Sequence, residues 1–270
     1  MSYRHLDVER RGDIVTCTIS NPPTHTLTAR GVVELQRLVD ELSRDDSVRV
    51  LVFTGAGDEV FIRHYEVGEL ADASEQAGDA AAPPEPDDGP RLHPMNRLCL
   101  SLEAQRFITV AAINGSTAGG GLELCLACDF RLAREGPFVL GLPETTVGIL
   151  PGAGGTQRLT RLLGTARALD LILHGRLLSP SEALDLGVVH RVYSSEAFDA
   201  DVRAFAEDLA GRAPIALAAA KRAIQGAHDR SLPEGLAFEQ EAFAETLRSE
   251  DAAGAMRAML EGKTWQWKGK

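Results

Sequence analysis

A run of three consecutive glycines constrains this chain more than any other feature of its sequence. Gly119, Gly120 and Gly121 follow the β-branched segment 108–113 and open an apolar stretch that predicts a helix to about Ala127. Glycine lets a ligand approach the backbone closely, and the first turn of a helix presents N–H groups that have no partner within the helix. The segment therefore predicts an anion site at a strand-to-helix junction.

Two common phosphate-binding motifs do not fit this segment. A Walker loop requires Lys and then Ser or Thr after its last glycine, whereas here Leu122 follows Gly121. Neither this segment nor residues 152–157 spell the GxGxxG pattern of a dinucleotide site. What remains is an oxyanion that develops during a reaction, with Glu123 about one helical turn beyond Gly120.

The rest of the sequence predicts a mixed α/β core followed by a helical tail. Segments 14–54 alternate strand-like and helix-like patterns, which is typical of a βαβ unit. Residues 71–90 are rich in Ala, Pro and acidic residues, and they predict a mobile surface insertion within a core that spans residues 1–197. Residues 198–270 show apolar spacings of three and four, which predict a C-terminal helical region.

The charge and the cysteines of the chain limit its partners and its location. The balance of 39 acidic and 28 basic residues gives a net charge of -11, so we expect no nucleic-acid partner. The longest apolar stretch contains polar residues and glycines, so we expect no membrane span. Four cysteines without a secretory signal indicate free thiols and a cytoplasmic location. Cys125 and Cys128 form a CxxC without a second pair or a nearby His, which predicts core packing rather than a metal site.

Two glutamates are candidates for acid–base chemistry, although each has a structural explanation when taken alone. Glu123 is expected in the first turn of a helix, where the dipole favours an acid, and Glu144 follows a proline that suits a helix start. Their segments resemble the crotonase superfamily: the pattern AxxNGxxxGGGxELxxxCD occurs at 111–129, and PExxxGxxPGxGGTQRL occurs at 143–159. The similarity extends over nearly the whole chain.

The resemblance implies a fold and an activity. It implies a spiral of ββα units around two sheets, with C-terminal helices that form a homotrimer, or a homohexamer of paired trimers. It also implies that the N–H groups of Gly120 and Tyr65 bind the thioester oxygen of an acyl-CoA, and that Gly152 N–H helps to place a water. We assign Glu123 as the base that activates this water and Glu144 as the acid that protonates the α-carbon. The implied reaction is the reversible hydration of a 2-enoyl-CoA to a 3-hydroxyacyl-CoA, with no metal and with coenzyme A as part of the substrate.

The loop around Tyr65 departs from the family pattern, because bulky residues replace a small, glycine-containing stretch. A glycine in place of His64 would allow a positive φ angle, which His adopts only at a cost, so we expect a reshaped loop. His64 either lines a modified acyl pocket or points away from the ligand, and His25 is expected to be structural. By resemblance, the further substrate-binding residues are Phe61, Arg63, His64, Gly119 and Gly121, together with Lys263 and Trp267 from the tail of a neighbouring subunit.

Two other functions stay open at this point. One is another enolate reaction, such as double-bond isomerisation or carbon–carbon hydrolysis, although isomerases commonly keep only the later glutamate. The other is a catalytically silent oligomer that binds acyl-CoA, if the loop at residues 63–66 no longer supplies the second N–H donor.

Overall fold

The strands of the chain form two sheets. The structure is a computed structural model that describes residues 3–78 and 92–270. Among these residues, the larger sheet has the strand order β1-β2-β3-β5-β7-β10, and the smaller one has the order β4-β6-β8-β9. The strands are β1 (Leu6–Arg11), β2 (Ile14–Ile19), β3 (Val50–Gly55), β4 (Val60–Ile62), β5 (Ile108–Ile113), β6 (Ser116–Ala118), β7 (Phe130–Arg134), β8 (Leu140–Gly141), β9 (Leu177–Leu178) and β10 (Arg191–Tyr193).

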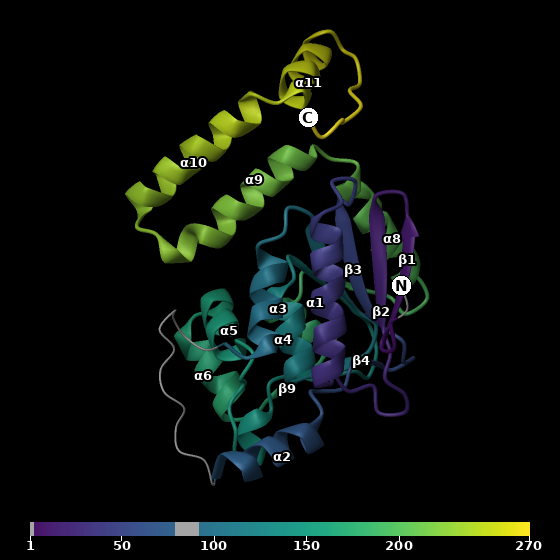
Figure 1. Cartoon of the computed structure of the whole chain (residues 1–270), viewed down its shortest axis with the longest axis vertical. Coiled ribbons are helices and arrows are strands. Elements are labelled where there is room, and N and C mark those ends of the chain that lie inside the picture. Colours follow the sequence, from purple (N-terminus) through teal and green to yellow (C-terminus); the bar gives the residue numbers. More distant parts are fainter. Residues whose placement is uncertain (1–2, 79–91) are drawn as a thin grey trace.

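Successive pairs of strands link the two sheets. In the pairs β3/β4, β5/β6 and β7/β8, the first strand joins the larger sheet and the second joins the smaller. Strands β2, β3, β5 and β7 pair in parallel, so a crossover must connect each to the next. This arrangement confirms the expected α/β spiral of ββα units (Figure 1). The helices are α1 (Ala29–Ser43), α2 (Val67–Gly78), α3 (Pro94–Glu103), α4 (Gly120–Ala127), η1 (Glu144–Val147), α5 (Gly155–Leu163), α6 (Thr165–Leu173), α7 (Pro180–Leu186), α8 (Phe198–Ala210), α9 (Pro214–Gln225), η2 (Gly226–Asp229), α10 (Leu232–Leu247) and α11 (Glu250–Leu260).

The larger sheet is buried on both faces. In β3, Leu51 and Phe53 belong to one hydrophobic cluster, whereas Val50 and Val52 belong to another, as the alternation of side chains along a strand requires. Helices α1, α3 and α4 contribute to the first cluster, and α8 contributes Phe198 to the second. The division of the chain at residue 197 stays a prediction. Helix α8 follows directly after this residue and packs on the larger sheet.

The predicted surface insertion begins later than we expected. Its first part, residues 71–78, forms the end of α2 instead of an irregular segment. These residues include Ala, Glu and Gln, which are strong helix formers, and residues 71–76 are exposed. The remainder, residues 79–90, lies outside the described residues.

The described part of the chain contains four free, buried cysteines, as the sequence predicts. Across residues 3–78 and 92–270, no helix is long and apolar enough to cross a membrane.

A buried ion pair attaches the C-terminal helices to the core. Helices α9, α10 and α11 extend from the body of the molecule in Figure 1. Lys221 of α9 lies 2.8 Å from Asp129, and the two side chains are 4% and 10% exposed. The Lys221 ammonium also donates to the carbonyls of Leu102 and Phe107, and Asp129 accepts from the Thr109 N–H. The ammonium and the carboxylate therefore both keep hydrogen-bond partners inside the protein.

Removing the Lys221 ammonium should destabilise the fold strongly. In Lys221→Met, the Asp129 carboxylate stays buried without its cation, which should lower the free energy of unfolding by about 3 to 5 kcal/mol. The measurement is urea unfolding followed by circular dichroism. Arg212→Met is a matched control, because its ion pair with Asp208 is exposed and should contribute less than about 1 kcal/mol. Equal losses in the two variants would show that the buried pair has no special role.

Candidate active site

The carboxyl group of Glu123 is buried at the start of α4 and is held by backbone N–H groups. Glu123 lies in the first turn of the helix and is 3% exposed. Its Oε1 atom accepts hydrogen bonds from Ala153 N at 2.7 Å and from Gly155 N at 2.8 Å. Two donors on one oxygen stabilise the ionised form and leave Oε2 to interact with another group.

The turn that supplies these donors, residues 151–155, requires glycine. A methyl group on Gly155 would lie 3.0 Å from Glu123 Oε1 and 2.8 Å from the side chain of Leu142, so a larger residue would push the carboxylate away. Gly154 has a φ angle of 99°, which other residues rarely adopt. In the sequence these glycines stand out only as part of a motif, and nothing in it indicates the roles of the Ala153 and Gly155 N–H groups.

The second carboxyl group has different surroundings. Glu144 begins η1, and its Oε2 atom is buried without a hydrogen-bond partner among the described residues. Burial, together with a smaller contribution from the negative charge of Glu123, raises the pKa of Glu144 to about 7. Burial also raises the pKa of Glu123, but the N–H groups of Gly155 and Ala153 oppose that effect. Glu144 is thus suited to carry a proton, whereas the two N–H donors favour the ionised form of Glu123.

Two free N–H groups lie next to each other near these acids. Neither Tyr65 N nor Gly120 N donates to any acceptor within residues 3–78 and 92–270. A methyl group on Gly120 would lie 3.6 Å from Tyr65 N, so the two backbones are in close approach. A methyl group on the neighbouring Gly119 would lie 3.1 Å from Glu144 Oε1, which places that acid beside the same glycines. Two adjacent free donors form a site for a developing oxyanion.

The loop around Tyr65 keeps an extended backbone despite its bulky side chains. Leu27 N donates to His64 O at 2.9 Å, and Glu66 N donates to Leu27 O at 2.8 Å. The expectation of a strained His64 is wrong: within the described part of the chain, His25 is the non-glycine residue with a positive φ angle, at 52°. The bridge between Leu27 and Tyr65 fixes the backbone in a form that any side chain can adopt.

The His64 ring braces its own loop. Its Nδ1 atom lies 2.7 Å from the carbonyl oxygen of Tyr65. The ring of Tyr65 is half-buried and packs edge-on against the ring of His93, the residue that precedes α3. Both bulky side chains therefore contribute to the support of the loop.

The other predicted site residues occupy varied positions. Phe61 is buried in the core, Gly121 packs against the backbone of Ile62, and Gly152 is exposed. Arg63 is exposed and donates to a loop carbonyl.

Two predicted contacts, Lys263 and Trp267, lie in the segment after α11. Figure 1 places that helix at the opposite end of the molecule from α2. Within one chain, these two residues are therefore remote from the loop that carries Tyr65. Their contact with a substrate stays a prediction that requires a neighbouring subunit.

The described residues include no group of three His, Cys, Asp or Glu side chains that could hold a metal ion. The groups that the described residues bring together at the site are two carboxyl groups and two N–H donors. Such a set can stabilise an enolate oxygen and move protons to and from the adjacent carbons.

Comparisons with known proteins show the family of the chain. The family described as enoyl-CoA hydratase/isomerase matches residues 9–270. The short-chain-enoyl-CoA hydratase of Clostridium acetobutylicum is 30% identical over 97% of this chain and 96% of its own length. Human enoyl-CoA hydratase domain-containing protein 2, mitochondrial, is 38% identical over 88% of this chain and 80% of its own. The crystal structure of an enoyl-CoA hydratase from Bacillus anthracis superposes with a TM-score of 0.88, at 32% identity, and covers 99% of this chain and 100% of that one. The chain therefore belongs to the enoyl-CoA hydratase/isomerase family of the crotonase superfamily.

Proposed function

We propose that this protein catalyses the reversible hydration of a 2-enoyl-CoA to a 3-hydroxyacyl-CoA. The observation that carries the proposal is the pair of buried carboxyl groups with opposite surroundings, next to two free N–H groups. The family supports an acyl-CoA reaction of the crotonase type, and the presence of both Glu123 and Glu144 favours hydration within it.

We assign a role to each group in this reaction. The Glu123 carboxylate takes a proton from water as the water oxygen attacks the β-carbon of the enoyl thioester. Electron density moves to the thioester oxygen, where each N–H donor, from Tyr65 and Gly120, contributes about 3 to 4 kcal/mol to transition-state stabilisation. The Glu144 carboxylic acid then gives its proton to the α-carbon. The pair carries one proton before and after the reaction: the proton of Glu144 goes to the α-carbon, and Glu123 gains a proton from the water.

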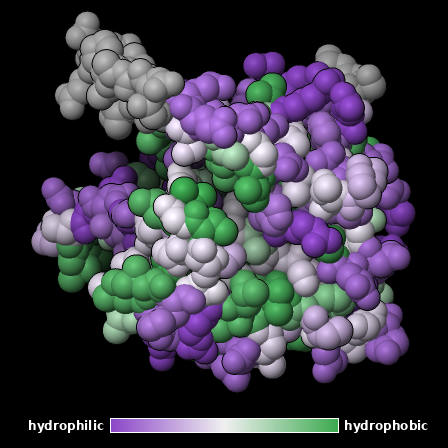
Figure 2. All heavy atoms as spheres, turned by 90° about the horizontal axis from the view of Figure 1, so that it is seen from below, coloured by the Kyte–Doolittle hydropathy of each residue, from purple (hydrophilic) through white to green (hydrophobic). Residues whose placement is uncertain are grey.

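Exposed apolar side chains support an acyl substrate. Val67 follows the Tyr65 loop and is 51% exposed, and Val147 and Leu150 follow Glu144 and are 69% and 63% exposed. Figure 2 views the molecule from the end where α2 lies in Figure 1, and it shows several apolar groups on that face. Apolar groups beside a polar catalytic centre are suited to a hydrocarbon chain attached to a thioester.

Replacing either acid by its amide should abolish most of the activity. In Glu123→Gln or Glu144→Gln, a proton-transfer group is lost while the shape is kept, so kcat for hydration of crotonyl-CoA or longer enoyl-CoAs should fall roughly 10²- to 10⁴-fold. The loss of enoyl absorbance in steady state is the measurement. Unchanged rates would end the proposal. Calorimetric binding of acyl-CoA by the native protein, without turnover of any enoyl-CoA, would instead select the silent binder.

The pH dependence of the hydration rate should follow the protonation of Glu144. The raised pKa of Glu144, about 7, means that the acid is protonated below this pH and loses its proton above it. We expect kcat/KM for hydration to be highest at slightly acidic pH and to fall above about pH 7. Once Glu144 has lost its proton, the fall should be about tenfold per pH unit. Dehydration should fall in parallel, because the overall reaction releases no proton and the equilibrium constant cannot depend on pH.

The matched variant for this experiment is Glu144→Gln, whose residual activity should lack the decline above neutral pH. A rate that stays level to strongly alkaline pH in the native enzyme would contradict the assigned role of Glu144.

We further propose that the chain assembles as a homotrimer, or as a homohexamer of paired trimers. Large apolar residues are exposed on α10 and α11, including Phe243 at 55%, Met259 at 82% and Leu260 at 88%. Exposed apolar groups of this kind favour burial against a neighbour. This assembly is also the way in which Lys263 and Trp267 could approach an acyl-CoA that is bound to another subunit.

Light scattering coupled to gel filtration tests the assembly. We expect a mass of three or six times the 29.0 kDa of one chain. The variant Met259→Glu/Leu260→Glu should shift the protein toward smaller species, because it places charges on the apolar surface. A native protein that runs as a monomer at micromolar concentration would contradict this proposal.

We propose a cytoplasmic location on the basis of the four free thiols, since free cysteines are typical of reducing compartments. The human relative is named as mitochondrial, and fractionation of the native cell would distinguish the two locations.

A further inference from the structure

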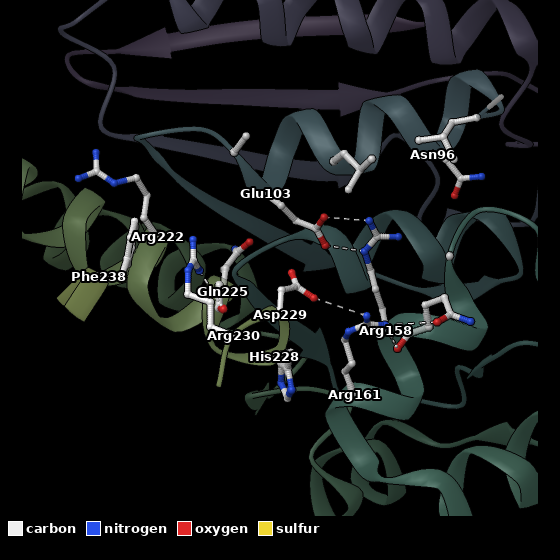
Figure 3. A pocket seen from close by; sticks show the side chains of 16 residues that line it. Asn96, Glu103, Arg158, Arg161, Arg222, Gln225, His228, Asp229, Arg230 and Phe238 are labelled. Carbon is white, nitrogen blue, oxygen red and sulfur yellow. Dashed lines mark hydrogen bonds and ion pairs between the residues drawn. The ribbon is translucent and has the colours of Figure 1, made fainter. Parts of the chain in front are cut away.

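The turn that holds Glu123 is itself held from its other side by two polar side chains. Asn96 of α3 donates from Nδ2 to Gly152 O at 2.9 Å. Arg158 of α5 donates from Nη1 to Ala153 O at 3.1 Å. Figure 3 shows both side chains at a hollow of about 800 Å³ that also borders α9 and α10. Asn96 and Arg158 approach the turn from this hollow, whereas Glu123 meets the turn from inside the protein.

The Asn96 contact is connected to the catalytic carboxylate through one peptide group. Gly152 O and Ala153 N belong to the same planar trans peptide, so the carbonyl and the N–H point in opposite directions. Asn96 binds the carbonyl end, and Glu123 Oε1 accepts from the N–H end at 2.7 Å. Fixing the carbonyl therefore fixes the direction of the N–H, and hydrogen bonds at both ends of an amide strengthen each other.

Without Asn96, the Gly152 carbonyl would have no hydrogen-bond donor among the described residues. Gly152 has no side chain and is exposed, and the next glycine, Gly154, has a φ angle of 99°. Glycines on both sides leave the backbone more conformational freedom than other residues would. A rotation of the peptide would turn the Ala153 N–H away from Glu123.

A neighbouring ion pair supports the second peptide of the turn. The Arg158 guanidinium binds Glu103 of α3 in a bidentate manner, with Nε–Oε1 at 2.5 Å and Nη2–Oε2 at 2.9 Å. This pairing directs Nη1 at Ala153 O, and Figure 3 shows the two dashed contacts between the side chains. Both Asn96 and Glu103 lie on α3, so the same helix supports two successive peptides.

We propose that Asn96 is a positioning residue for Glu123, which acts by orienting the Gly152–Ala153 peptide and has no contact with the substrate. The inference rests on the proposed function, since it assigns Asn96 to the base of that reaction. Arg158 and Glu103 provide the frame in which the peptide is held. Asn96 lies outside the two sequence motifs at residues 111–129 and 143–159, so the sequence alone does not indicate this role.

The test uses two variants. Asn96→Leu keeps nearly the same side-chain shape without the N–H donor, and Asn96→Ala shows whether any effect of the leucine comes from its size. Arg97→Ala is the matched control, because Arg97 is an exposed residue on the same helix and makes no side-chain hydrogen bond among the described residues. In both Asn96 variants we expect kcat to fall roughly ten- to a hundredfold with KM changed less than about twofold. The acid limb of kcat/KM should move to higher pH, since Glu123 loses one of the donors that favour its ionised form.

A measurement that needs no turnover accompanies the kinetics. Hydrogen exchange of the peptide that covers residues 151–155, followed by mass spectrometry, should become faster in both Asn96 variants and stay unchanged in Arg97→Ala. If native enzyme hydrates no enoyl-CoA, the proposed function fails, while faster exchange would still support the role of Asn96 in holding the turn.

Two results would overturn the inference. Native exchange of residues 151–155 in both folded Asn96 variants would show that the peptide does not depend on this side chain. A large rise in KM with unchanged kcat would show that Asn96 contacts the substrate instead.

Discussion

The burial of the Glu123 carboxyl group is the constraint on which the rest of the site depends. An ionised carboxylate at 3% exposure is costly unless hydrogen bonds replace its water. Here two backbone N–H groups, from Ala153 and Gly155, meet one oxygen. This solution requires the turn at residues 151–155 to lie against the first turn of α4. The glycines of both segments allow that approach, because side chains at Gly155 or Gly120 would fill the space that the reacting groups need.

The loop around Tyr65 and the turn at residues 151–155 share one arrangement. In each, a peptide group has its carbonyl bound by a hydrogen-bond donor, and its N–H faces the site. In the loop, His64 O accepts from Leu27 N, and the N–H of the same peptide is that of Tyr65. In the turn, Asn96 binds the carbonyl of Gly152. Because the donors belong to the main chain, the side chains of the loop can change without loss of the donor. This explains how a loop with His and Tyr in place of small residues keeps its geometry.

The sequence predicted the features that depend on local pattern. Segments 14–19 and 108–113 are strands, the triple glycine opens α4, and Glu123 and Glu144 lie beside the same glycines. It failed where distant segments decide the outcome. The φ angle of His64 is set by pairing with Leu27, and the role of Asn96 depends on a carbonyl 56 residues away. The end of α2 was missed for a different reason, since composition indicated exposure and exposure does not exclude a helix.

The unequal surroundings of the two acids determine which one holds the shared proton at rest. Backbone donors favour the ionised form of Glu123, whereas burial without a partner at Oε2 favours the neutral form of Glu144. An enzyme cannot change the equilibrium between enoyl and hydroxyacyl thioesters, so this asymmetry has no effect on the direction of net flux. In the proposed reaction, it determines only that the free enzyme rests in the state that begins hydration. The reverse of that proposed reaction, dehydration, would start from the less populated arrangement, with the proton on Glu123, and the binding energy of the substrate would have to supply the difference in free energy.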